Sequence, residues 1–141
     1  MKRIYKKVIV FGIGGVSYGI CEIIWRGFTH PSMLLLGGLC FILLYEIEEK
    51  YRSVPLTVRC ISGGIIITSL ELITGCIVNK VLGMQVWDYS DMPFNLYGQI
   101  CLNFSLIWVI MCPPAFFLCR IIMSEFCKKC INQKVFLPKA E

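Results

Sequence analysis

Two glutamates occupy matching positions within the most hydrophobic parts of the chain. Glu22 and Glu71 each lie seven residues after a glycine pair, Gly14–Gly15 in the first case and Gly63–Gly64 in the second. A carboxylate inside a bilayer costs roughly 3 kcal/mol or more, so it usually faces the interior of a helix bundle or a wet cavity. Two such residues at matching positions predict one internal polar site, which could respond to a proton or another cation.

The basic residues near these glutamates limit what each carboxylate can do. Arg26 lies one helical turn after Glu22, so the two side chains can form an ion pair on one helix face, which would give Glu22 a structural role. Glu71 has no basic residue at helical spacing and must reach Arg26 or His30 across the bundle, or be protonated. His30 is the only histidine, which excludes a multi-histidine metal centre within one chain.

Four apolar segments must position these side chains, and each is near the length that spans a hydrocarbon core of ~30 Å. The chain of 141 residues is 57% hydrophobic, which does not fit a soluble domain. The first segment has no small-residue cleavage site, so we expect it to stay in the mature protein. The sequence predicts an all-α integral membrane domain over residues 1–126 and a short basic tail over 127–141, with spans at about Val8–Trp25, Pro31–Glu46, Val58–Val78 and Gly98–Ile122.

The glycine and glutamate positions recur with a period of 49 residues. The first and third spans run in the same direction, so the repeat is a parallel one made of two related helical hairpins. Glycines on the glutamate face allow a neighbouring helix to approach closely. At about 1.5 Å per residue, both glutamates lie roughly 20 Å from the inner edge, in the outer half of the bilayer.

The distribution of Lys and Arg predicts the orientation. With a cytoplasmic N-terminus, twelve of the fourteen basic residues are inside, and only Arg26 and Lys80 are outside. The positive-inside rule therefore predicts a multi-pass protein of the cell membrane with both termini in the cytoplasm. The net charge of +5 then reflects topology and anionic headgroups, and no basic face interleaved with aromatic residues suggests nucleic-acid binding.

Lys80–Asn95 is the only long outer segment, and Trp87–Asp91 within it is either an interfacial anchor or a lid over the glutamates. Gln99 and Asn103 share a face at the start of the fourth span. Further along, Pro113–Pro114 predicts a kink, or alternatively a broken helix that lines a pathway.

The residues that we expect at the outer-half site are Glu22, Arg26, His30, Glu71, Trp87, Asp88, Tyr89, Asp91, Asn95 and Gln99.

Seven of the nine cysteines lie in or beside the spans, where they act as small apolar side chains. Cys127 and Cys130 form the one CxxC spacing, and either a zinc site shared by a dimer or palmitoylation would use them. Nothing in the sequence indicates a cofactor, a phosphate-binding loop or a nucleophile elbow.

The middle of the chain, about Trp25–Trp108, resembles the putative ABC transporter permease family (type IV, the CmpB-like group of small bacterial membrane proteins). The most specific part of the resemblance is the Trp-Asp-Tyr-Ser string at 87–90 with the following Pro-Phe-Asn at 93–95 and Gly-Gln-Ile-Cys at 98–101. Trp25–His30 and the Leu-Leu-Gly-Gly-Leu-Cys-Phe string at 35–41 also match, as do Ile66–Thr68, Glu71, Gly75, Val78–Asn79, Val86 and Leu102.

The resemblance implies membrane transport without naming a substrate. The chain carries no ATP-binding motif, so an ABC-type role would need a separate ATPase or another membrane subunit, and four spans imply a homodimer or larger assembly. Small four-span exporters with a glutamate in the first span offer an analogy for Glu22. We therefore expect a transporter or transport-accessory subunit rather than an enzyme. The alternatives are a non-transporting structural or regulatory subunit and an intramembrane enzyme acting on lipid or envelope precursors.

Overall fold

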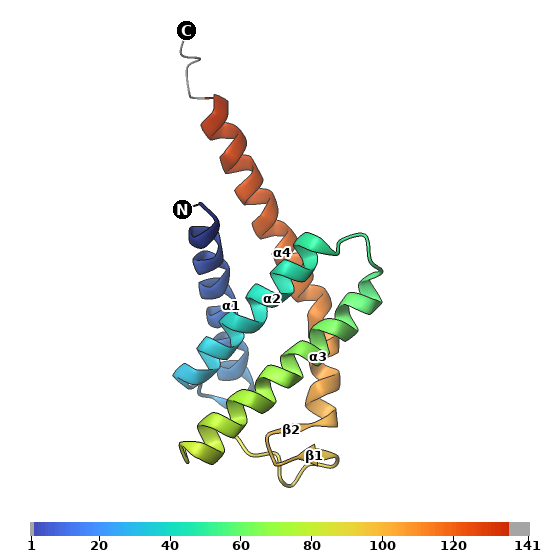
Figure 1. Ribbon diagram of the computed structural model, residues 1–141. Coiled ribbons are helices and arrows are strands. Elements are labelled where there is room, and N and C mark those ends of the chain that lie inside the picture. The colour runs from blue at the N-terminus through green and yellow to red at the C-terminus, as the bar shows by residue number, and fades with distance from the viewer. Residues whose placement is uncertain (1, 136–141) are drawn as a thin grey trace.

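The computed structural model describes residues 2–135, which form a bundle of four long helices (Figure 1). The helices α1 and α2 form a first hairpin, and α3 and α4 form a second. A short π-helix, η1, continues α3, and two strands of two residues precede α4. The bounds are α1 Lys2–Arg26, α2 Pro31–Lys50, α3 Leu56–Gly75, η1 Cys76–Val81, β1 Asn95–Leu96, β2 Ile100–Cys101 and α4 Leu102–Val135.

All four helices are long and apolar enough to cross a membrane, which confirms the prediction of a four-span, all-α membrane protein. Their exposed surfaces are rich in large apolar side chains, as expected where lipid is the solvent. The start of α1, the α2–α3 turn and the C-terminal end of α4 lie at one end of the bundle, which we name the terminal end (Figure 1). The α1–α2 turn and the strands lie at the opposite end, the loop end.

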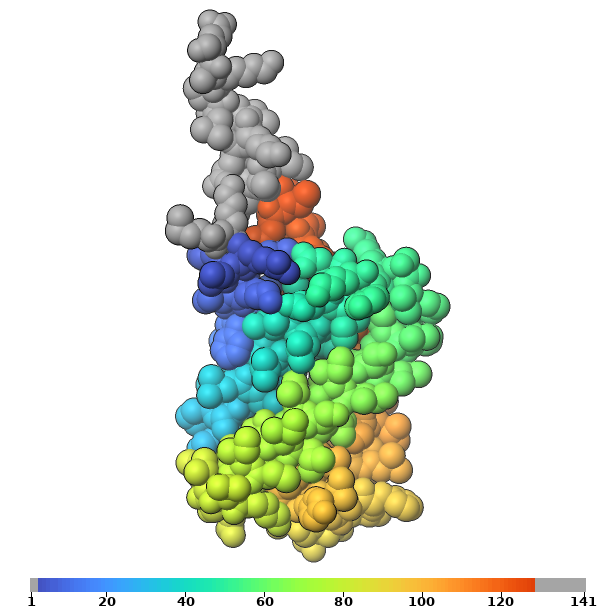
Figure 2. Space-filling model, viewed as in Figure 1, coloured from blue at the N-terminus to red at the C-terminus, as the bar shows by residue number. Residues whose placement is uncertain are grey.

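The two hairpins have close helix contacts at their glycines, as the parallel repeat predicts. In the first hairpin, a Cβ on Gly15 would come within 2.7 Å of the backbone oxygen of Leu34. In the second, Gly64 is in contact with Val109 and leaves no room for a Cβ. Helices α2 and α3 then join the hairpins by lying side by side across the face shown in Figure 2.

The core between the hairpins is made of apolar side chains from α2, α3 and α4, together with one residue of the long loop. Trp87 is 7% exposed, so the loop contributes to the core instead of only lying at the membrane surface. The buried members of this cluster are Met33, Leu36, Cys40, Leu44, Cys60, Ile67, Trp87, Cys112 and Phe116.

The fourth helix begins at Leu102, four residues after the expected start at Gly98. Gly98 has a φ of +68°, a conformation that suits glycine and ends the preceding turn. The next residues pair with β1, with Leu96 opposite Ile100 and Asn95 opposite Cys101, so the chain enters α4 from an extended conformation.

Helix α4 continues without a break through Pro113 and Pro114. The alternative of a broken helix is therefore not what the structure has, and a kink at this pair stays a prediction. Helical geometry extends to Val135, well past the expected end of the fourth span at Ile122. Of the tail expected over 127–141, residues 136–141 lie outside the described residues.

Candidate functional site

Glu71 is buried where α3, α4 and the long loop meet. Its side chain is 1% exposed. The indole nitrogen of Trp108 donates a hydrogen bond of 2.8 Å to one carboxylate oxygen, and the hydroxyl of Tyr89 donates one of 3.2 Å to the other. Among the side chains that the structure describes, no Lys, Arg or His forms an ion pair with it. Glu71 therefore has neutral donors on both oxygens and no cation.

A cavity of about 210 Å³ opens beside this carboxylate, between the two hairpins. Its walls are almost entirely apolar and come from all four helices, while Glu71, Tyr18 and Ser17 supply the polar groups. Tyr18 also packs against the Trp108 ring, with 5.7 Å between the ring centroids. The cavity can hold a small apolar group next to one acidic side chain.

Glu22 lies in a different environment from Glu71. Arg26 donates a hydrogen bond of 2.6 Å to one oxygen, and Thr29 donates one of 2.6 Å to the other. The contact with Arg26 has the i, i+4 spacing seen in the sequence. Arg26 also donates to the carbonyl of Val86 at 3.0 Å, so the pair fixes the α1–α2 turn and ties it to the long loop.

Tyr89 connects the loop to Glu71. Its ring stacks on Phe104 of α4 with 4.7 Å between centroids, and its backbone nitrogen donates to Gly98 at 2.8 Å. Burial, together with the nearby charge of Glu71, raises the pKa of the Tyr89 hydroxyl, so this group stays protonated and can only donate to an ionised carboxylate. The loop thus places a permanent hydrogen-bond donor on Glu71.

A second set of buried hydrogen bonds holds the loop against the end of α3. Asn79 donates to the carbonyl of Trp87 at 3.0 Å and to the side chain of Gln99 at 2.8 Å, and it accepts from the nitrogen of Val86 at 2.7 Å. The indole of Trp87 donates to the Gln99 carbonyl at 3.0 Å. Asn79 lies in η1, and π-helical turns occur frequently at functional sites.

The other residues expected at the site lie apart from the glutamates. The ring of His30 contacts Ser32 at 2.8 Å and caps the start of α2. Asp88 is exposed and accepts from Ser90 in a turn, and this hydrogen bond lowers the pKa of the Asp88 carboxyl. The side chain of Asn95 donates to two loop carbonyls. Asp91 is exposed at the loop surface.

A buried charge network at the terminal end was not expected from the sequence. Glu48 is 0% exposed and forms an ion pair with Arg59, which is 4% exposed. Arg120 of α4 donates to the second oxygen of Glu48 at 2.7 Å, and Arg52 lies 3.9 Å from that oxygen. The arginines expected to mark topology therefore gather around one buried carboxylate.

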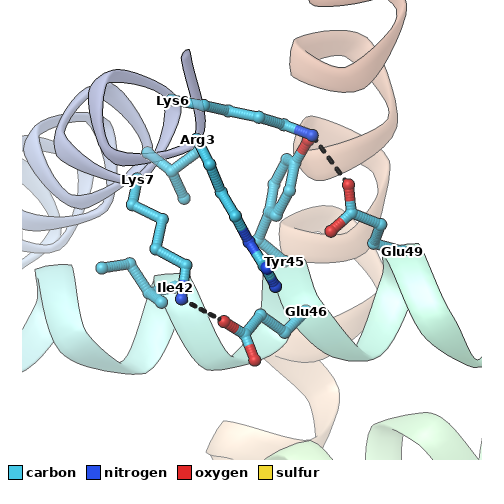
Figure 3. Close-up of a pocket in the computed structure, with 8 residues that line it drawn as sticks. Arg3, Lys6, Lys7, Ile42, Tyr45, Glu46 and Glu49 are labelled. Carbon is cyan, nitrogen blue, oxygen red and sulfur yellow. Dashed lines mark hydrogen bonds and ion pairs between the residues drawn. The ribbon is translucent and has the colours of Figure 1, made fainter. Parts of the chain in front are cut away.

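A shallower group of charges lies beside it, between α1 and α2, around a cavity of about 300 Å³ (Figure 3). Lys6 pairs with Glu49 and Lys7 with Glu46, each at 2.7 Å. The Lys6 ammonium also lies 4.9 Å from the centre of the Tyr45 ring. These pairs hold the two helices of the first hairpin together at their ends.

One comparison with known proteins identifies a family for this chain. A family model described as "Putative ABC-transporter type IV" matches residues 6–137, nearly the whole chain. No curated protein and no solved structure matches. The match covers both hairpins and the loop between α3 and α4. The chain therefore belongs to the family described as "Putative ABC-transporter type IV", a transport-related group of membrane proteins.

Proposed function

We propose that this chain is a permease-like subunit of a membrane transport system and that Glu71 is the group on which its substrate or its coupling proton acts. The observation that carries the proposal is a fully buried carboxylate that lines a cavity and has only neutral donors. An ionised carboxylate in this position lacks a cation, so a proton or a positively charged group of a ligand would complete the site.

The walls of the cavity indicate which ligands fit. Apolar residues surround a single acidic group, so an amphipathic molecule with a cationic head matches the lining better than an anion or a sugar does. The cavity of about 210 Å³ accommodates one substituent rather than a large molecule. A wider passage would need a second copy of the chain or another subunit, and an ATP-driven cycle would need a separate ATPase.

Under this proposal the two glutamates have different roles. Glu22 is already neutralised by Arg26 and acts as a structural pair that orients the loop, whereas Glu71 provides the reactive group. The loop around Trp87 and Tyr89 acts as a lid, because Tyr89 would have to release Glu71 when a ligand takes its place. If the loop end is extracellular, as the basic residues indicate, this lid faces outward.

One observation favours a second function, a structural or regulatory subunit without transport activity. Both oxygens of Glu71 are satisfied, and the bonds join α3 to α4 and to the loop. In that case the carboxylate only locks helices together. The enzyme alternative gains no such support, because His30 caps α2 and contacts neither glutamate in the described structure.

Glu71→Gln separates these functions. The amide keeps the size of the side chain, and its oxygen can still accept from Trp108 while its NH2 group donates to Tyr89, so folding should survive. Phenyltrimethylammonium, an amphipathic cation with a small head, serves as the probe because its size suits the cavity. Its binding to the purified protein is followed by tryptophan fluorescence in neutral detergent. We expect wild type to bind the cation and Glu71→Gln to lose binding with an unchanged thermal midpoint.

Glu22→Gln is the matched control, because it removes the other buried carboxylate. It should lower the thermal midpoint and retain binding of the cation. Equal binding by wild type and Glu71→Gln would refute the proposed site. Collapse of the Glu71→Gln protein in detergent would instead favour the structural function.

A further inference from the structure

The terminal end carries a second concave site, which lies far along the bundle from Glu71. Arg52 of the α2–α3 turn and Arg120 of α4 line a cavity of about 500 Å³, and the rest of its wall is α4. The remaining lining residues are Ile121, Met123, Ser124 and Cys127. None of them belongs to the cavity beside Glu71.

The charge balance around this cavity is strongly positive. Three arginines, Arg52, Arg59 and Arg120, share the single carboxylate of Glu48. Arg59 is buried and directed at that carboxylate, and it also donates to the carbonyl of Val54. The side chains of Arg52 and Arg120 are 67% and 40% exposed. Glu48 therefore neutralises one guanidinium group, and the equivalent of two positive charges remains at the cavity.

The two lining arginines have donors to spare. Arg120 uses its Nε on Glu48, and Arg52 approaches the same oxygen with its Nε at 3.9 Å. Within the described residues the structure records no hydrogen bond from the terminal nitrogens of either side chain. A guanidinium group whose Nε is anchored presents those nitrogens as a fixed fork, which matches the oxygens of a phosphate.

The neighbouring lysines show that this pattern is not general at the terminal end. Lys6 is paired with Glu49 and Lys7 with Glu46 (Figure 3), and Glu46 also accepts from Lys50. Each of these two lysines is already held by a carboxylate, so it has less to offer an anion. Arg52 and Arg120, by contrast, share one carboxylate with a third arginine.

An apolar path leads from the arginines along the outside of α4. Ile110, Phe117 and Ile121 are 71%, 64% and 45% exposed. Their spacings of seven and four residues place them on one face of the helix. A free phosphate would make no use of this stripe, whereas the acyl chains of a lipid would lie against it.

We propose that Arg52 and Arg120 bind the phosphate of an anionic phospholipid, whose acyl chains lie along the exposed face of α4. The site is at the end of the transmembrane helices, which is the depth of the headgroups. A basic pocket at a helix end is the kind of site that selects anionic headgroups over zwitterionic ones. The bound lipid would strengthen the contact between the α2–α3 turn and α4.

The test uses the full-length protein in neutral detergent and native mass spectrometry. Dioleoylphosphatidylglycerol and dioleoylphosphatidylcholine are titrated separately, and the occupancy of the first bound lipid is measured. Wild type should favour the anionic lipid. Arg52→Gln should weaken binding of phosphatidylglycerol about five-fold and leave phosphatidylcholine unchanged, since one cation near a headgroup contributes about that factor. Arg52→Lys should restore part of the preference.

Lys7→Gln is the matched control, because it removes a basic residue from the same end of the bundle, where it is already paired with Glu46. It should bind both lipids as wild type does. Arg52 is in an exposed turn, so the thermal midpoint of Arg52→Gln in lipid-free detergent should match that of wild type. Equal binding of the two lipids by wild type, or equal losses in Arg52→Gln and Lys7→Gln, would overturn the proposal.

Discussion

The indole N–H of Trp108 and the Oε2 atom of Glu71 are 2.8 Å apart, and this hydrogen bond joins α4 to α3 beside the cavity. Replacing Trp108 with Phe removes the donor and leaves a fully buried acceptor without its partner. We expect the free energy of unfolding to fall by about 1–3 kcal/mol. Unfolding by SDS titration in mixed micelles measures this change. Trp25→Phe is the control, because Trp25 is 76% exposed, and an equal loss in both variants would contradict the role of the hydrogen bond.

Glycine in α1 is required only where α2 comes close. A Cβ at Gly15 would meet the backbone oxygen of Leu34, which cannot move without shifting α2. Gly15→Ala should therefore cost about 1–3 kcal/mol, as overpacked contacts do. Gly12→Ala is the matched control, since a Cβ there meets nothing within 4 Å and alanine favours the helix. Thermal midpoints of the two variants should move in opposite directions, and parallel shifts would show that α1 and α2 are not in close contact.

Glu48 balances Arg59, an arginine that is itself buried. Glu48→Gln leaves Arg59, which is 4% exposed, without a counter-charge, and breaking a buried pair in this way costs about 3–5 kcal/mol. Glu125→Gln is the control, because its pair with Lys128 is 63% and 68% exposed, and such pairs contribute about 1 kcal/mol or less. The two losses can be compared by SDS titration, and similar small values would mean that Glu48 does not hold the terminal end together.

The architecture could be predicted because its signals are local in the sequence. Apolar runs of span length give the four helices, and the spacing of Glu22 and Arg26 gives the one ion pair that was expected and is present. The recurring glycine pairs likewise indicated where the helices of each hairpin approach. Each of these features depends on residues within a few turns of one helix.

The partners of the other charged groups could not be predicted, because they come from distant parts of the chain. Glu48 meets Arg120, 72 residues away, and Glu71 meets Trp108, 37 residues away. Asn79 lies in a π-helical turn, which apolar periodicity does not reveal. A signal for Glu48 did exist, because Glu48, Arg59 and Arg120 each lie within two residues of the inner end of an expected span. Pairing them, however, requires the packing of three helices.

The side of the membrane that the terminal end faces can be read from Cys127, which is exposed there. The positive-inside rule places it in the cytoplasm. In a variant that keeps Cys127 as its single cysteine, a membrane-impermeant maleimide should label the protein only after the cell membrane is permeabilised. A cysteine placed at Asp91, on the exposed loop, should react in intact cells and is the matched control. Labelling of Cys127 from outside would reverse the orientation.

The side chain of Cys130 lies outside those described, so a role for the CxxC spacing stays a prediction.

Arg26 should govern how tightly the loop is held. Arg26 donates to Glu22 at 2.6 Å and to the carbonyl of Val86 at 3.0 Å. Among the described residues of α1, it is the only charged side chain that donates a hydrogen bond to the backbone of the loop. A hydrogen bond to a charged group contributes about 1.5–3 kcal/mol. Arg26→Gln should therefore raise amide hydrogen exchange in residues 82–99 about ten-fold or more, measured by mass spectrometry, while peptides from the middle of α2 keep their protection. Lys80→Gln removes an exposed basic residue next to the loop and should leave exchange unchanged. If Arg26→Gln also leaves it unchanged, the contacts of Asn79, Trp87 and Tyr89 suffice to hold the loop. Under the proposed function, a ligand at Glu71 would then have to displace those contacts.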